Sequence, residues 1–265
     1  MSSSLPLFAT QARDTWPGLV GWAAAIAGTT LVYLPLHRSF GDESIAQVME
    51  SMPQALIKAL NYDLLASGPG YVQATIYGLL GFAFLTIAAV GWGGQAVGGD
   101  EEAGRLELTL AHAVSRSRVV LERALAMTLK VIILAGVTLA LVLALNGPSD
   151  LGIDAGNALE TSVVFAALAL LPGTMALCVG AWTGRRVPAL VAGAAVAVLG
   201  YTLNALGNQD ENLEWMHTLS PYHWAYGNQP LINGVDWGGF ALLAALSALL
   251  VALAMVGLNR RDVSV

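Results

Sequence analysis

Apolar residues run through this chain in six long blocks, separated by shorter segments that hold most of its charged residues. A helix needs about 20 apolar residues to cross the roughly 30 Å hydrocarbon core of a bilayer. Backbone polar groups cannot stay unpaired in lipid, and the blocks exceed the roughly 10-residue strands of a membrane barrel, so each is expected to be helical. The pattern predicts an all-α membrane protein with six transmembrane helices in one domain, residues 1–265. The blocks cover residues 19–36, 71–98, 124–145, 158–182, 187–206 and 237–258.

The composition excludes an ordinary soluble fold. The chain is 56% hydrophobic and 11% charged, with a mean hydropathy of +0.64, so lipid must solvate much of its apolar surface. The first block is longer than the roughly 7–15 apolar residues of a secretory signal, so we expect it to be retained as a span. Cys178, the only cysteine, lies inside an apolar block, which rules out an intrachain disulfide.

Basic residues are distributed unevenly among the connecting segments, and an excess of Lys and Arg marks cytosolic loops. With the N-terminus inside, nine of the twelve bases fall in cytosolic segments, Arg38 and Lys58 fall outside, and Lys130 lies within a block. Both the N- and C-termini are therefore predicted to be cytosolic. The net charge of −6 then arises from external loops, and no nucleic-acid partner is expected. The nine bases are Arg13, Arg105, Arg116, Arg118, Arg123, Arg185, Arg186, Arg260 and Arg261.

Two of the predicted external loops contain patterns of their own. The loop after the first block has an apolar stripe at helical spacing, interrupted at Pro53, which predicts an amphipathic external helix. That stripe consists of Ile45, Val48, Met49, Met52, Leu56 and Leu60. The loop before the last block is rich in aromatic residues that favour the headgroup level, so an interfacial or re-entrant segment is expected there. Its aromatic residues are Trp215, Tyr222, Trp224 and Tyr226.

The cytosolic segment at residues 99–118 carries the most information. Acidic residues at its start suit a helix N-terminus, and Leu106, Leu110 and Val114 form a stripe. Ser115 can cap the helix that follows. A short amphipathic helix at the membrane face is predicted. From the residues alone, it is either a surface for a cytosolic partner or a solvated loop that satisfies the positive-inside rule.

Residues 101–116 resemble the permease subunits of type-2 ABC exporters, a branch of the ABC transporter permease family. In that family an acidic pair, a Gly-Thr-Leu-Glu run, several leucines and a Pro-Val-Ser-Arg element form the coupling helix. This chain departs from the pattern at Arg105, Ala113 and Arg123, where Thr, Pro and Lys are usual. Two further matches are the Leu-Ser-Pro-Tyr run at residues 219–222 and the Arg-Arg-Asp run at residues 260–262.

The resemblance implies that this segment docks on a cytosolic ATPase subunit of an exporter. The expected ATPase-coupling residues are Glu101, Glu102, Gly104, Arg105, Leu106, Glu107, Leu110, Val114, Ser115 and Arg116. Leucines would fill a groove of the ATPase and charged residues would fix the register. Arg185 and Arg186, in a tight turn before Pro188, are expected to make a possible secondary cytosolic contact.

The resemblance also implies partners. The only lysines, Lys58 and Lys130, lie outside any Gly-Lys-Ser/Thr context, so no phosphate-binding loop is recognised. ATP and Mg would then bind the partner ATPase, and this chain is expected to be a non-catalytic permease subunit without a cofactor. Six spans form half of a twelve-span pathway, which implies a second permease copy or a paralogue. An amphipathic or lipophilic substrate and a prokaryotic plasma membrane are expected.

Two other classes of function would need residues that the sequence lacks in the required places. An ion-driven secondary transporter would need ionisable groups at the midplane of the bilayer, but Lys130 and Glu160 are expected near opposite ends of their spans. A membrane-embedded enzyme would need a reactive constellation, and His217 with His223 lacks the spacing typical of a zinc site. Pro172 and Gly173 are expected to loosen the fourth span, through packing alone or as a flexible point.

Overall fold

The structure is a computed structural model that describes residues 16–39, 53, 67–110 and 115–261. It contains six continuous helices long and apolar enough to cross a membrane, which confirms the predicted fold class. The described part of the chain holds no strand. The expected external helix at residues 45–60 lies outside the described residues, apart from Pro53, and so does Val114.

The second of these helices is composite. It consists of α5 (Gly68–Val72), the π-helical segment η2 (Gln73–Leu80), α6 (Gly81–Gly94), the π-helical segment η3 (Gln95–Gly99) and α7 (Asp100–Glu102), and is followed by the short α8 (Arg105–Leu110). The other five are α2 (Trp16–Ser39), α9 (Arg116–Asn146), α10 (Ala155–Thr183), α11 (Arg186–Gly207) and α14 (Trp237–Arg260). Before α14 come the 3₁₀ helix η4 (Glu211–Leu219), α12 (Pro221–Tyr226) and α13 (Pro230–Asn233).

The helices extend beyond the apolar blocks that predict them, most of all at α9. This helix begins at Arg116, eight residues before the apolar block, because Ser115 Oγ accepts a hydrogen bond from Arg118 N at 3.4 Å. The expected capping role of Ser115 is confirmed. The charged turn from Arg116 to Arg123 is therefore helical and not a loop.

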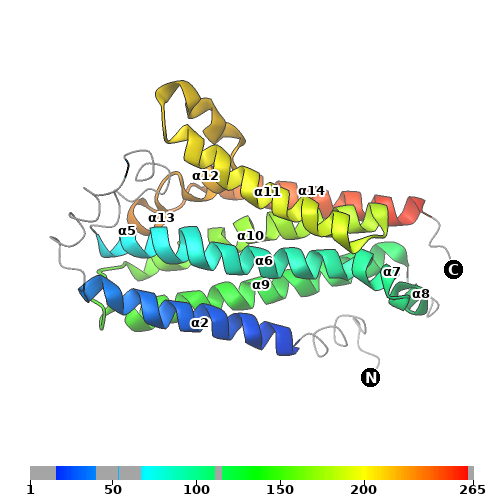
Figure 1. Ribbon diagram of the computed structural model, residues 1–265, viewed down its shortest axis with the longest axis horizontal. Helices are drawn as coiled ribbons and strands as arrows, with labels where there is room; N and C mark the ends of the chain where they lie inside the picture. Colours follow the sequence, from blue (N-terminus) through cyan, green and yellow to red (C-terminus); the bar gives the residue numbers. More distant parts are fainter. Residues whose placement is uncertain (1–15, 40–52, 54–66, 111–114, 262–265) are drawn as a thin grey trace.

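The long helices lie side by side along one axis (Figure 1). The first residues of α2 and the last residues of α14 lie at the same end as α7 and α8, which we call the α8 end. The helices α5, α12 and α13 lie at the opposite end, which we call the α12 end. An even number of crossings places both termini of the bundle at one end.

Helix α10 is the centre of the bundle. In its most apolar 18-residue window 78% of the residues are buried, compared with 22% in α2, α11 and α14. It packs on α6, α9, α11 and α14. Small residues permit this packing, since a Cβ at Gly93 would overlap the carbonyl of Gly173, and a Cβ at Gly193 would lie 2.7 Å from Pro172 O. Pro172 and Gly173 thus lie at close helix contacts, which favours the packing role expected for them.

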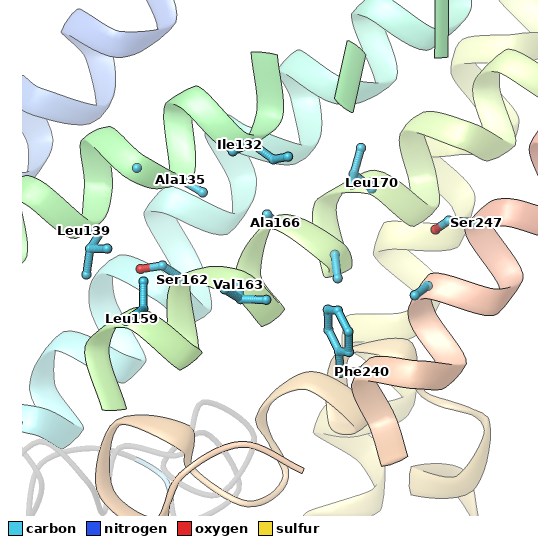
Figure 2. A pocket seen from close by; sticks show the side chains of 13 residues that line it. Ile132, Ala135, Leu139, Leu159, Ser162, Val163, Ala166, Leu170, Phe240 and Ser247 are labelled. Carbon is cyan, nitrogen blue, oxygen red and sulfur yellow. The ribbon is translucent and has the colours of Figure 1, made fainter. Parts of the chain in front are cut away.

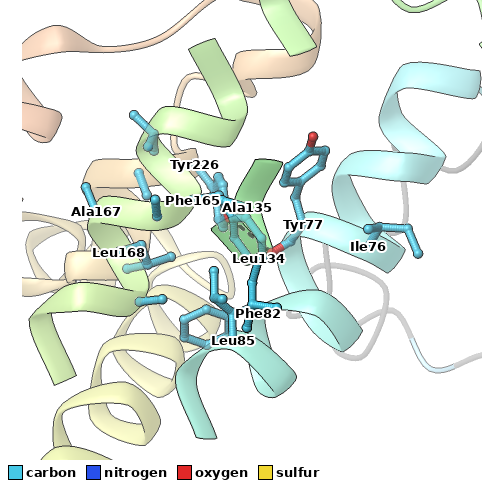
Figure 3. Close-up of a cluster of buried hydrophobic side chains, with 14 of the residues drawn as sticks. Ile76, Tyr77, Phe82, Leu85, Leu134, Ala135, Phe165, Ala167, Leu168 and Tyr226 are labelled. Carbon is cyan, nitrogen blue, oxygen red and sulfur yellow. Dashed lines mark hydrogen bonds between the residues drawn. The ribbon is translucent and has the colours of Figure 1, made fainter. Parts of the chain in front are cut away.

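The helix η2 supports the α12 end of the core. Tyr77 packs edge-on against Phe165 at a ring distance of 5.3 Å (Figure 3). The hydroxyls of Tyr77 and Ser162 share a hydrogen bond of 2.8 Å. The Tyr226 hydroxyl donates to Tyr77 O at 3.0 Å, and the Tyr222 hydroxyl donates to Gly78 O at 2.9 Å. Both acceptors lie in the π-helical segment.

Tyr222 and Tyr226 differ in their surroundings from Trp215 of the same loop. Both tyrosines are buried, because their hydroxyls satisfy backbone carbonyls of η2. Trp215, by contrast, is 56% exposed. The segment before α14 therefore folds back against the bundle and is fixed to it by tyrosine hydrogen bonds.

Two histidines pair beside these tyrosines. The rings of His217 and His223 stack at 3.9 Å, and they contact Asn208 Oδ1 at 3.0 Å and Asn204 Oδ1 at 3.2 Å. Across the described residues, no group of three or more His, Cys, Asp or Glu side chains is placed to hold a metal ion. Burial and the neighbouring His217 lower the pKa of His223 to about 4, with Asp236 acting in the opposite direction.

We predict that Gly93→Ala destabilises the bundle by about 1–3 kcal/mol, because the added methyl group overlaps the backbone of α10. Gly91→Ala is the matched control, since a Cβ there meets nothing within 4 Å. Thermal unfolding in detergent can be followed with a thiol-reactive dye, because the single cysteine, Cys178, is buried in the folded protein. Equal melting temperatures for the two variants would contradict the close packing of α6 on α10.

We also predict that stability falls as the pH drops from about 6.5 towards 4. In this window the unfolded chain protonates His223, whose usual pKa is about 6.5, while the folded protein keeps it neutral. The melting temperature of His223→Gln should depend less on pH over the same range. Parallel pH profiles for the two proteins would show that His223 does not titrate in this way.

Candidate functional site

The α8 end of the bundle holds a network of charged side chains around the junction of α7 and α8. Helix α7 ends at Glu102 and is followed by Ala103 and Gly104, and Gly104 has a φ of +67°, a left-handed conformation that favours glycine. Helix α8 then starts at Arg105 and runs for six residues. The junction therefore lets α8 run in a different direction from the second long helix.

Asp100 is shared by bases from two helices. Its Oδ2 lies 2.9 Å from Arg123 Nη2 of α9, and its Oδ1 lies 2.8 Å from Arg105 Nη2 of α8. Gln95 Nε2 donates to the same Oδ1 at 3.2 Å. The Arg123 side chain is only 7% exposed and also donates to Ala96 O. A cation this deeply buried needs a paired anion, so Asp100 compensates the charge of Arg123.

Glu101 pairs with the end of α14. Arg261 binds both carboxylate oxygens, with Nη2 to Oε1 at 2.8 Å and Nη1 to Oε2 at 3.1 Å. Its Nη1 also donates to Ala181 O at 3.2 Å. Arg116 supports the same helix end by donating to Leu258 O at 3.2 Å and to Arg261 O. Carbonyls at a helix C-terminus lack partners within the helix, so Arg116 acts as a cap for α14.

Glu102 binds the start of α11. Its Oε1 accepts a hydrogen bond of 3.0 Å from the backbone N–H of Arg186. The turn between α10 and α11 also approaches the second long helix closely, since a Cβ at Gly98 would lie 2.6 Å from Arg185 O. The side chains of Arg185 and Arg186 themselves are exposed. The two arginines therefore remain placed for a contact outside the bundle.

Helix α8 presents two different faces. Leu106 is completely buried in an apolar cluster of the chain itself, and Leu110 packs partly against that cluster. Leu108 points the other way and its side chain is 68% exposed. The predicted stripe of Leu106 and Leu110 is confirmed, but it faces the bundle. Leu106 thus packs inside the permease.

Most of the predicted coupling residues that the structure describes make contacts within the chain. Glu101, Glu102, Leu106 and Arg116 do so, and Ser115 caps α9. Arg105 is exposed but binds Asp100, and Leu110 is half-buried against the apolar cluster. Gly104 is exposed and Glu107 is half-buried.

Sequence reasoning missed four residues of this region: Asp100, Arg123, Arg261 and Leu108. The signal for Asp100 is its place at the end of a long apolar block, directly before two further acids. Arg123 falls just before an apolar block, and a charge in such a position needs a partner. Arg261 belongs to the Arg-Arg-Asp run that the resemblance singles out, without any indication of its partner.

Two lateral grooves open on the side of the bundle. The first lies between α6 and α11, has a volume of about 610 Å³, and includes Thr86, Arg186 and Tyr201 in its lining. Thr86 is buried, and its hydroxyl has no hydrogen-bond partner among the described residues. The second groove lies between α9, α10 and α14, has a volume of about 460 Å³, and is lined by Ala135, Ala166 and Phe240 (Figure 2).

The two ionisable residues considered for ion-driven transport are held apart. Lys130 is buried, and its Nζ lies 5.2 Å from the centre of the Trp92 ring, a cation–π contact. Glu160 Oε2 accepts a hydrogen bond of 3.4 Å from Val235 N near the α12 end. Neither belongs to the ion pairs found among the described residues.

Comparison with known protein families identifies the chain. The family model described as multidrug efflux system permease Rv1217c, C-terminal domain, matches residues 4–259, almost the full length. No curated protein matches the sequence. The match agrees with the resemblance of residues 101–116 to ABC permeases and with the six apolar helices. This membrane protein is therefore a transport permease that belongs to the family of the multidrug efflux system permease Rv1217c C-terminal domain.

Proposed function

We propose that this permease is the transmembrane subunit of an ATP-driven ABC exporter, coupled through residues 101–116 to a separate ATPase subunit. The observation that carries the proposal is Leu108, a leucine 68% exposed on a short helix that stands at one end of a transmembrane bundle. Leu108 lies outside the six apolar helices, so lipid does not account for its exposure, and an apolar residue with charged neighbours suits an interface with an apolar core and a polar rim. Arg105 and Glu107 flank it and can fix the register of the partner.

The distribution of bases supports a cytosolic α8 end. Arg105 on α8, Arg116 and Arg118 at the start of α9, Arg185 and Arg186 in the α10–α11 turn, and Arg260 and Arg261 at the end of α14 all lie there. Arg38, in contrast, hydrogen-bonds Pro148 O at the other end. By the positive-inside rule, this distribution supports a cytosolic α8 end, where ATP would be available. Arg185 and Arg186 offer a secondary contact for the same ATPase.

ATP and Mg²⁺ would bind the ATPase, and this chain would hold no cofactor. Two permease units, either two copies of this chain or this chain with a paralogue, would together form the pathway. The assembly would lie in a prokaryotic plasma membrane. Each unit would contribute half of the wall, and each would receive force at its own α8.

The groove between α6 and α11 suits an amphipathic or lipophilic substrate. Its walls are largely apolar, with the hydroxyls of Thr86 and Tyr201 and the charge of Arg186 as polar groups. A groove of this kind matches the usual features of small-molecule sites, which are apolar with few polar groups. We favour it over the α9–α10–α14 groove because α11, which forms one wall, begins at the residue that Glu102 binds.

We predict that Leu108→Asp weakens binding of the ATPase by roughly 10- to 100-fold, the loss expected for an apolar side chain at an interface centre. The permease itself should remain folded, because the side chain is exposed. Leu106→Asp should instead lower the melting temperature and the yield, because it places a carboxylate in the apolar cluster. The measurements are co-purification of a Walker-type ATPase with the tagged permease, and thermal unfolding of each variant.

Full co-purification of the ATPase with Leu108→Asp would show that α8 is not the docking surface. If no ATPase co-purifies with the wild-type protein, the assignment to the ABC transporters is wrong. Transport by the purified permease in liposomes with an ion gradient alone would assign it to the secondary transporters.

We predict that Ala194→Trp reduces efflux by filling the α6–α11 groove, whereas Ala244→Trp, the same change in the α9–α10–α14 groove, leaves it close to the wild-type rate. Both alanines are exposed in this structure, so neither change should prevent folding. Accumulation of lipophilic drugs in cells that express each variant is the measurement. The reverse order of the two effects would assign the pathway to the other groove.

A further inference from the structure

We propose that Asp100, Glu101 and Glu102 of α7 form a three-point clasp that connects α7 separately to α9, α14 and α11, and that through the Asp100–Arg105 contact this clasp sets the position of α8 relative to the bundle. The force that an ATPase would exert on α8 rests on the proposed function. The clasp itself consists only of contacts within this chain. The three residues are positioning residues, since each acts through a contact inside the permease.

The geometry of a helix explains why three consecutive acids can hold three different helices. Successive side chains on an α-helix point about 100° apart, so three in a row fan across more than half of the circumference. Here each direction meets another element. Asp100 reaches Arg123 of α9, Glu101 reaches Arg261 at the end of α14, and Glu102 reaches the first backbone N–H of α11.

The clasp also braces the junction between α7 and α8. Gly104 has a left-handed conformation that a change of helix direction requires, and a Cβ there would meet nothing within 4 Å. Arg105, the first residue of α8, crosses this junction to bind Asp100 through both Nε and Nη2. On the far side, Leu106 anchors α8 in the apolar cluster. The short helix is thus held by one apolar anchor and one ionic brace.

The three contacts differ in their surroundings. The side chains of Asp100 and Arg123 are 17% and 7% exposed, so removal of the acid would leave Arg123 buried without a counter-ion and would destabilise the folded protein. The Glu101–Arg261 pair is more accessible, at 16% and 25% exposed, and a Cβ at Gly184 would lie 2.5 Å from Glu101 Oε1. The contact from Glu102 to Arg186 N is exposed. Glu101 and Glu102 can therefore be altered while the fold is retained.

The helices that the clasp reaches are the less buried ones. In α11 and α14 only 22% of the most apolar window is buried, and in α9 33%, compared with 78% in the central α10. Outer helices of this kind can shift without disrupting the core. A displacement of α8 would therefore be passed to the wall of the α6–α11 groove through Glu102, and to α14 through Glu101.

The experiment measures distances from α8 to two helices by double electron–electron resonance in the purified permease with Cys178→Ala. One spin-label pair joins Leu108→Cys to Leu253→Cys on α14, and the other joins Leu108→Cys to Val187→Cys on α11. All three labelled side chains are exposed. We expect Glu101→Gln and Arg261→Gln to broaden the distances to α14 and leave those to α11 unchanged, and Glu102→Ala to do the opposite.

A matched control and a rescue variant complete the test. Glu214→Gln removes an exposed acid at the α12 end and should alter neither distance. The charge-swapped protein with Glu101→Arg and Arg261→Glu should restore the narrow α14 distribution. Melting temperatures should stay close to that of the parent protein, because loosening of one connection is not unfolding of the bundle.

Unchanged distributions in the Glu101 and Glu102 variants would overturn the clasp. So would equal broadening of both distances together with a lower melting temperature, which would show a merely structural role. In the complex with the ATPase, Leu108 is left native and a single label at Leu253→Cys on α14 reports the response to ATP and vanadate. Glu101→Gln should retain binding of the ATPase but reduce that response by about fivefold or more, the lower range of coupling between sites. If no ATPase binds the wild-type protein, the proposed function fails, while the distances in the permease alone still decide the clasp.

Discussion

A buried cation constrains the whole α8 end of this permease. The Arg123 side chain lies almost fully inside the protein, and a charge in that position is tolerated only with a paired anion and further hydrogen bonds. Asp100 and the carbonyl of Ala96 supply them, so the end of the second long helix must lie beside α9. Because Asp100 also binds Arg105, the same interaction fixes where α8 begins. The neighbouring acids then meet α14 and α11 as a consequence of helix geometry.

At the opposite end of the bundle, neutral hydrogen bonds hold the described residues together. Tyr222 and Tyr226 donate their hydroxyl protons to carbonyls in the π-helical segment η2, and Tyr77 of that segment packs against Phe165 in α10. The segment before α14 is thereby fastened to the centre of the core. Closer to the α8 end, the contact of Gly93 in α6 with Gly173 joins the second long helix to α10. The molecule thus has a tightly packed centre, and the ion pairs between described residues gather at the α8 end.

This separation is consistent with the work of a transport permease. The central α10 provides a frame with little freedom, since its contacts depend on glycines and on buried hydrogen bonds. The outer helices α11 and α14 bury a smaller share of their surface, and one of them forms a wall of the α6–α11 groove. In the proposed coupling, a force applied at α8 would reach these outer helices through the contacts of Glu101 with Arg261 and of Glu102 with Arg186 N.

The sequence by itself determined the six helices, the cap at Ser115 and the family, because hydropathy, helix length and local motifs are properties of contiguous residues. It also placed Leu106 and Leu110 on one stripe of α8. Only the tertiary structure decided that this stripe faces inward. Apolar residues alternate at positions 106, 108 and 110, so a six-residue helix offers an apolar side chain in either direction.

The partners of the acids were likewise beyond the reach of the sequence. Glu101 pairs with a base 160 residues away, and many arginines at the same end of the bundle have the same charge. Which arginine Glu101 meets depends on how α14 packs against α10. It also depends on the lack of a side chain at Gly184, where a Cβ would lie 2.5 Å from Glu101 Oε1. The burial of Tyr222 and Tyr226 has the same origin, since their acceptors are carbonyls in a helix more than 140 residues earlier in the chain. Local pattern fixes the helices, whereas long-range packing fixes which side chains meet.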